Sequence, residues 1–165
     1  MRLSLAVTYC TERRTFLEYA EPQVNRLIEE LRAAWLVVGF DLYSLGYRIL
    51  EGYTAFDLGS LRTLDMKEKW EGKLKSVGLC DVANATLGTE FSRSDTQRIK
   101  WYRQEKIREL AHDCKSTVQM LKLLHEHGLR HRRISYKMPS GRRKIVPVFW
   151  GYRKKQRRSN ARSTL

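Results

Sequence analysis

Residues 95–128 read DTQRIKWYRQEKIRELAHDCKSTVQMLKLLHEHG, and residues 132–150 read RRISYKMPSGRRKIVPVFW. The first stretch repeats apolar residues at helical spacing, so it predicts a long amphipathic helix that Gly128 ends. The second alternates apolar and polar residues around Pro139-Ser140-Gly141, which is typical of a β-hairpin. Pro147 lacks an N–H to donate, so the second strand is expected at a sheet edge.

The long helical stretch has two interpretations. It is either one continuous helix, or it breaks near residues 112–116 into a helix-turn-helix. In the second case residues 115–127 form a recognition helix, and the hairpin makes the module winged-helix-like. Lys115 stands where such a turn usually has Gly, and no Gly or Pro lies in 112–116, so the local pattern favours continuity.

The region before residue 95 also reads mainly as helix. Thr11, Pro22 and Ser60 are typical residues at the start of a helix, and Gly39 and Gly78 are typical residues after its end. The expected helices cover residues 12–20, 22–38, 40–52 and 61–77, followed by a short helix and a loop around Gly88 in 79–92. The fold class predicted for the whole chain is therefore mainly α, a helical domain followed by a basic C-terminal β-hairpin.

The composition divides the chain into three regions. Residues 1–94 are predicted to be a helical core and partner-binding region, and residues 95–152 the long helix or helix-turn-helix with the basic hairpin. Residues 153–165 are basic and poor in apolar residues, so a disordered tail is expected. Aromatic residues crowd one part of the first region and suggest a homodimer or heteromeric face: Trp35, Phe40, Tyr43, Tyr47 and Tyr53.

The charge is strongly segregated. The 165 residues carry a net charge of +14, from 32 Lys and Arg against 18 Asp and Glu. Residues 127–165 hold 13 of the basic residues and no acidic residue, whereas residues 1–126 are nearly balanced. A local positive field attracts polyanions, and Arg binds phosphate with two parallel hydrogen bonds. The sequence therefore predicts that the protein binds nucleic acid.

The candidate nucleic-acid contacts form two groups. Four residues lie off the apolar face of the candidate recognition helix and are expected to read bases: Lys115, Ser116, Gln119 and Lys122. The cations of the hairpin and tail are expected to contact phosphate: Arg130, Arg132, Arg133, Lys137, Arg142, Arg143, Lys144, Arg153, Lys154, Lys155, Arg157 and Arg158.

No catalytic, cofactor or metal site is predicted. The chain has no Gly-rich phosphate loop, and its basic segment has no carboxylate to hold a metal. His125, His127 and His131 supply only one side of a zinc-ligand pattern. The cysteines are odd in number and widely spaced, and no apolar run is long enough for a membrane span. We therefore expect an intracellular protein of the cytoplasm or nucleoid that is neither an enzyme nor associated with a membrane.

Three functions fit these patterns. The leading prediction is a DNA-binding transcriptional regulator or accessory factor, with DNA favoured over RNA. An RNA-binding structural component of a ribosomal or viral ribonucleoprotein uses the same kind of basic segment. A basic adaptor that binds an acidic protein partner is the third class.

Overall fold

The computed structural model describes residues 2–70, 77–92 and 94–150. The helices are α1 Val24–Ala33, α2 Tyr47–Leu50, α3 Leu79–Leu87, α4 Asp95–Arg103 and α5 Ile107–His131. The strands are β1 Leu5–Cys10, β2 Thr15–Ala20, β3 Val37–Gly39, β4 Thr63–Asp65, β5 Arg133–Lys137 and β6 Arg143–Pro147. In the described part of the chain these strands form three two-stranded sheets, so the architecture is mainly helical with small sheets. The described helices lack the combination of length and apolar character that crossing a membrane requires.

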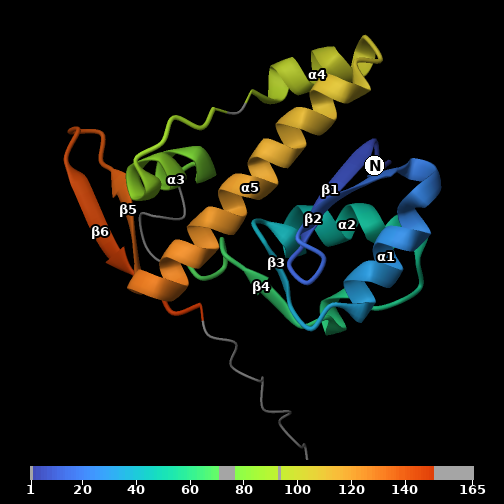
Figure 1. Ribbon diagram of the computed structural model, residues 1–165, viewed down its shortest axis with the longest axis horizontal. Coiled ribbons are helices and arrows are strands. Elements are labelled where there is room, and N and C mark those ends of the chain that lie inside the picture. Colours follow the sequence, from blue (N-terminus) through green and yellow to red (C-terminus); the bar gives the residue numbers. More distant parts are fainter. Residues whose placement is uncertain (1, 71–76, 93, 151–165) are drawn as a thin grey trace, which may run out of the picture.

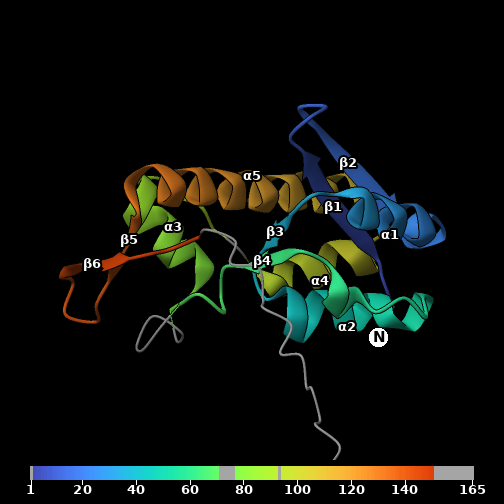
Figure 2. The ribbon, with the colours of Figure 1, turned by 90° about the horizontal axis from the view of Figure 1, so that it is seen from below.

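Helix α5 is the central element of the molecule (Figure 1). The β1–β2 hairpin packs against it on one side, and α4 folds back beside its N-terminal end (Figure 2). Helix α3 and the β5–β6 hairpin gather near its C-terminal end. Met120, Leu124 and Gly128 are buried, and their spacing of four places them on one face of the helix.

Two apolar clusters form the core. One joins β2, α1 and α2 around Tyr19, Leu27 and Leu50. The other joins β4, α3, α5 and the β5–β6 hairpin, with Leu124 and Ile134 fully buried in it. The C-terminal hairpin is therefore part of a core and not an appendage to a finished helical domain.

The predicted helix over residues 12–20 is wrong, because β1 and β2 form an antiparallel hairpin there. Val7 pairs with Glu18 in this register. The rings of Tyr9 and Phe16 meet edge to face with centroids 5.0 Å apart, and cross-strand aromatic pairs of this kind stabilise a two-stranded sheet. These cross-strand contacts stabilise the extended conformation of both segments, so residues 12–20 do not form the predicted helix.

The second predicted helix is too long. The observed helix α1 ends at Ala33, and the next residue, Ala34, already has extended backbone. The Val37 N–H then donates to the Arg62 carbonyl at 2.8 Å, and β3 pairs with β4 in parallel. The helix expected over residues 61–77 is also wrong, since β4 occupies 63–65; residues 71–76 lie outside the described part of the chain.

Two further predictions are partly right. The stretch 40–52 is helical but divided into a π turn, Leu42–Gly46, the short α2 and a 3-10 turn, Glu51–Tyr53. The short helix in 79–92 is confirmed as α3, with Gly88 at φ +68° directly after it.

The predicted long helix is two helices, and its break does not lie at residues 112–116. Helix α5 is continuous through that segment and ends at His131, beyond Gly128. The break lies at residues 104–106, where Glu105 has φ +55°. The winged-helix-like arrangement, which needs a turn before residue 115, is not confirmed.

Candidate nucleic-acid interface

The predicted β-hairpin is confirmed, and its turn explains its register. The Met138 N–H donates to the Arg142 carbonyl, and the Gly141 N–H donates to the Met138 carbonyl, both at 2.8 Å. Gly141 has φ +80°, a conformation that glycine adopts without a steric penalty. The turn pairs Lys137 with Arg143, and antiparallel pairing continues to Arg133 and Pro147.

The two faces of the hairpin differ in character. Ile134 and Tyr136 of β5 are buried, as is Val148 just after β6. Cross-strand partners point to the same side of a sheet, so Lys137 and Arg143 share the other face with Arg133. All three cations are exposed.

The hairpin is fixed to the helices at two points. The Thr86 hydroxyl of α3 accepts from the Ser135 N–H at 2.9 Å and donates to the Ser135 carbonyl at 3.1 Å. Trp150 is buried against α5, where its ring lies over Gly128 and stacks on His125 with centroids 5.8 Å apart. These contacts hold the exposed face of the hairpin in a set orientation beside the end of α5.

That end of α5 extends the cationic surface. The rings of His127 and His131 are 4.4 Å apart. The pKa of His127 is lowered, first by partial burial and then by the positive charges of His131, Arg133, Arg143 and Arg130. The cations of two elements are therefore close enough to repel one another electrostatically. We call this surface the basic face: His127, Arg130, His131, Arg133, Lys137 and Arg143.

No acidic residue occurs between residues 127 and 150 to balance this charge. The acid that precedes the segment, Glu126, is paired with Lys122 on the same helix at 2.9 Å. Crowded like charges lower stability unless an anion neutralises them. The basic face therefore concentrates like charges that a bound anion would stabilise.

The other predicted hairpin cations lie around the basic face. Arg142 is exposed at the turn, and Lys144 projects from the opposite side of β6. Arg132 has φ +53° and ends α5, also exposed. The tail positions Arg153, Lys154, Lys155, Arg157 and Arg158 lie outside the described residues.

The structure separates the four candidate base-reading residues from the basic face. Lys115 is ion-paired with Glu18 of β2, and Lys122 lies over the Tyr9 ring at 5.4 Å in addition to its pair with Glu126. The Ser116 hydroxyl donates to the His112 carbonyl at 3.1 Å. Gln119 is half-buried. The two lysines of this group therefore face the β1–β2 hairpin, and Ser116 lines an open groove formed by α5, Trp101 of α4 and residues 90–92.

Sequence reasoning missed a cluster of charged residues at the ends of β3 and β4. The buried Asp65 carboxylate accepts from the N–H groups of Asp41, Tyr43 and Lys67 at 2.9, 3.2 and 3.0 Å. The Lys67 ammonium pairs with Asp41 at 2.5 Å and lowers the pKa of that carboxyl group. These bonds hold the loop after β3 against β4. Among the described residues, no group of three or more His, Cys, Asp or Glu is arranged to hold a metal ion.

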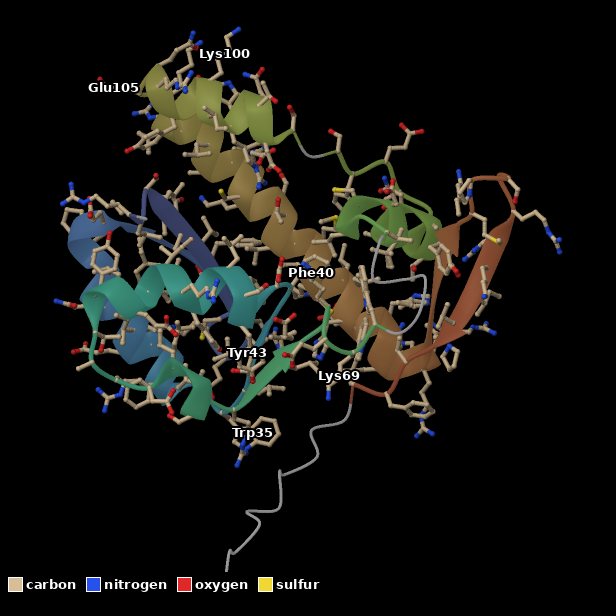
Figure 3. All side chains as sticks on the ribbon, turned by 180° about the vertical axis from the view of Figure 1, so that it is seen from behind. Trp35, Phe40, Tyr43, Lys69, Lys100 and Glu105 are labelled. Atoms are coloured by element: carbon tan, nitrogen blue, oxygen red, sulfur yellow. The ribbon has the colours of Figure 1, made fainter. Side chains whose placement is uncertain are left out.

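The aromatic residues expected at a partner face have different environments. Tyr47 is buried, with its hydroxyl 2.6 Å from that of Thr63. Phe40 packs against the Trp70 ring. Trp35 is 71% exposed at the edge of the molecule, where the Arg62 guanidinium lies 4.8 Å above its ring (Figure 3).

Comparison with known proteins identifies no relative. No protein-family model matches the chain, and no curated protein and no solved structure shows significant similarity to it.

Proposed function

We propose that this protein is an intracellular nucleic-acid-binding factor that contacts phosphates through the basic face. The observation that carries the proposal is the convergence of α5 and the β5–β6 hairpin on one cationic surface, built from a segment, residues 127–150, that contains no acidic residue. Guanidinium groups bind phosphate oxygens with paired hydrogen bonds, and each neutralised phosphate releases condensed counterions.

The rigidity of the hairpin supports the proposal. Thr86 and Trp150 hold it from two sides, so its arginines need less ordering on binding than those of a flexible segment. His127 adds a proton-dependent charge at the edge of α5, because a nearby phosphate favours its protonated form.

The role that we propose is that of a regulator or accessory factor in DNA transactions, including transcription. Phosphate chemistry is common to DNA and RNA, so a ribonucleoprotein component is the alternative outcome of the binding experiment below. A protein partner at the N-terminal region stays a prediction, and the exposed Trp35 is the residue at which to test it.

The test is a salt titration of binding with a matched pair of variants. Arg133→Ala/Arg143→Ala removes two charges from the basic face, and Arg26→Ala/Arg48→Ala removes two exposed charges from α1 and α2. Wild-type affinity for a labelled oligonucleotide should fall steeply with salt. The first variant should bind more weakly, with a log–log salt slope shallower by about 1–2.

The second variant should behave like wild type. Equal losses in both variants would show that general charge, and not the basic face, causes binding. A wild-type affinity that does not change with salt would refute the proposal, and tight binding of polyglutamate in competition would favour an acidic protein as the partner.

A further inference from the structure

The exposed face of the hairpin carries apolar side chains beside its cations. Along β6 and the residues after it, Val146, Val148 and Trp150 turn inward. Ile145 is 57% exposed and Phe149 is 75% exposed. Extended backbone alternates its side chains between two faces, so Ile145 and Phe149 share the outer face with Arg143.

The pairing of the strands leaves this apolar row open. Ile145 lies opposite Ser135, which is buried beside Thr86 of α3, so the open part of the face at this level is on β6; Pro147 lies opposite Arg133. The Val148 N–H donates to the Arg132 carbonyl at 3.0 Å, which continues the pairing beyond β6 and directs Phe149 outward. The centre of the face is therefore apolar, with Lys137 and Arg143 at one end and Arg133 at the other.

We infer that the ligand of the basic face is single-stranded nucleic acid, with an unpaired base stacked on Phe149, a second base against Ile145, and the phosphates between Arg133 and Arg143. This inference rests on the proposed function and specifies its substrate class. Stacking on an aromatic side chain needs a base whose flat surface is free, which single strands offer and duplexes hide.

The side chains of this face are poorly suited to a duplex groove. Base edges are read by bidentate donors and acceptors such as Arg, Asn and Gln. The apolar positions of this face are Ile145, Pro147 and, just beyond the last strand pair, Phe149, and their side chains cannot form such bonds. Residues 145 and 149 are separated by about 14 Å in an extended strand, so the bases that they contact belong to different nucleotides.

The experiment compares three labelled ligands of the same sequence with the full-length protein. These are single-stranded DNA, single-stranded RNA and duplex DNA, each about 20 nucleotides long so that they exceed a typical single-strand site. We expect both single strands to bind more tightly than the duplex at physiological salt. The two single-strand arms distinguish the sugar, because only RNA offers a 2′-hydroxyl.

The variant series tests stacking directly. Phe149→Ala should lower single-strand affinity about tenfold with an unchanged salt slope, because stacking releases no counterion. Phe149→Tyr should retain the affinity, whereas Phe149→Leu should lose it despite being apolar. Tyr102→Ala is the matched control, since it removes an exposed aromatic side chain of α4 outside the basic face.

Each outcome separates this inference from the proposed function. Duplex affinity equal to or above that of the single strands, or a Phe149→Ala variant that binds like Tyr102→Ala, overturns the single-strand inference alone. Wild-type protein that binds none of the three ligands overturns the proposed function. Phe149 is exposed, so its variants should fold, and thermal unfolding checks that they do.

Discussion

Gly128 shows how closely the hairpin is fitted to α5. A Cβ atom built at this position would lie 2.2 Å from the Trp150 ring, closer than any real contact. Alanine is otherwise the better helix former by about 1 kcal/mol. At this position the clash should exceed that gain, since overpacking costs about 1–3 kcal/mol.

We therefore predict that Gly128→Ala lowers the free energy of unfolding, measured by urea denaturation. Gly52→Ala is the control, because a Cβ there meets no atom within 4 Å. A Gly128→Ala variant as stable as the control would mean that Trp150 is not held against the helix. Combining Gly128→Ala with Trp150→Leu should recover part of the loss if the ring is its cause.

Two half-buried histidines near the C-terminal end of α5 predict a pH dependence of stability. Burial lowers the pKa of His125 below its ordinary value of 6.5, and it acts in the same direction on His127. As pH falls, the unfolded chain takes up these protons first. Stability should be fully present above pH 6.5 and decline as the pH falls through the folded-state pKa values.

The measurement is the urea midpoint between pH 7.5 and 5. His125→Gln/His127→Gln should flatten the decline over this range, whatever its effect on stability at neutral pH. A wild-type midpoint that stays constant or rises on acidification would contradict the half-buried, neutral state of these histidines.

At the scale of elements, the turn between α4 and α5 is a Schellman motif with an unusual residue. The Lys106 N–H donates to the Trp101 carbonyl at 2.9 Å, and the Glu105 N–H donates to the Tyr102 carbonyl at 3.1 Å. Glu105 occupies the left-handed position that glycine usually fills. Figure 3 shows this residue at the end of the helical pair, far from the hairpin.

Glu105→Gly should therefore raise stability by about 0.5–1 kcal/mol, because it removes the steric cost of the positive φ. Gln104→Gly next to it, where φ is −92°, should lower stability by a similar amount. Thermal unfolding of both variants gives the comparison, and a loss in Glu105→Gly would show that the carboxylate matters more than the backbone.

The elements that the sequence predicts correctly are those whose signals are local. Residues 132–150 alternate around a Pro-Ser-Gly turn, and Gly88 follows α3 directly, so neighbours alone determine both. The break at residues 104–106 contains neither Gly nor Pro, so the sequence has no local indication that the helix ends there. Strand β3 pairs with residues 63–65. This long-range contact cannot be inferred from the spacing of Trp35 and Val38, which by itself predicts a helix.

The candidate site also combines features that are visible in the sequence with features that depend on long-range contacts. The hairpin cations were predictable because the charge of residues 127–165 is visible in the sequence. The separation of Lys115 and Lys122 from that surface was not, because it depends on Glu18 and Tyr9 of a hairpin that the sequence pattern presents as helix. The contact between His127 and His131 was not predictable either, because it requires the helix to continue beyond Gly128.

For the whole molecule, the shared core decides where the chain can be shortened. Ile134, Tyr136, Val148 and Trp150 pack in one cluster with α3 and α5. The sequence alone predicts a folded helical domain after truncation at Gly128. The structure predicts instead that the truncated protein does not fold stably, because removal of the hairpin exposes the apolar faces of α3 and α5.

Residues 1–150 should unfold cooperatively near the wild-type temperature, whereas residues 1–128 should lose cooperative unfolding in calorimetry. The 1–150 protein lacks six tail cations and should bind nucleic acid with a shallower salt slope than the full chain. A cooperative transition in the 1–128 protein would show that these residues fold as an independent helical domain, as the sequence predicts.

The hydrogen bonds between Thr86 and Ser135 also affect how copies of the protein behave beside one another. Both backbone groups of Ser135 that point away from β6 are occupied by one hydroxyl, so another chain cannot add a strand there. The outer edge of β6 carries Arg143 and Lys144 and ends at Pro147, features that discourage edge-to-edge association. Copies of the protein at high local concentration would therefore stay separate and not grow into a continuous sheet.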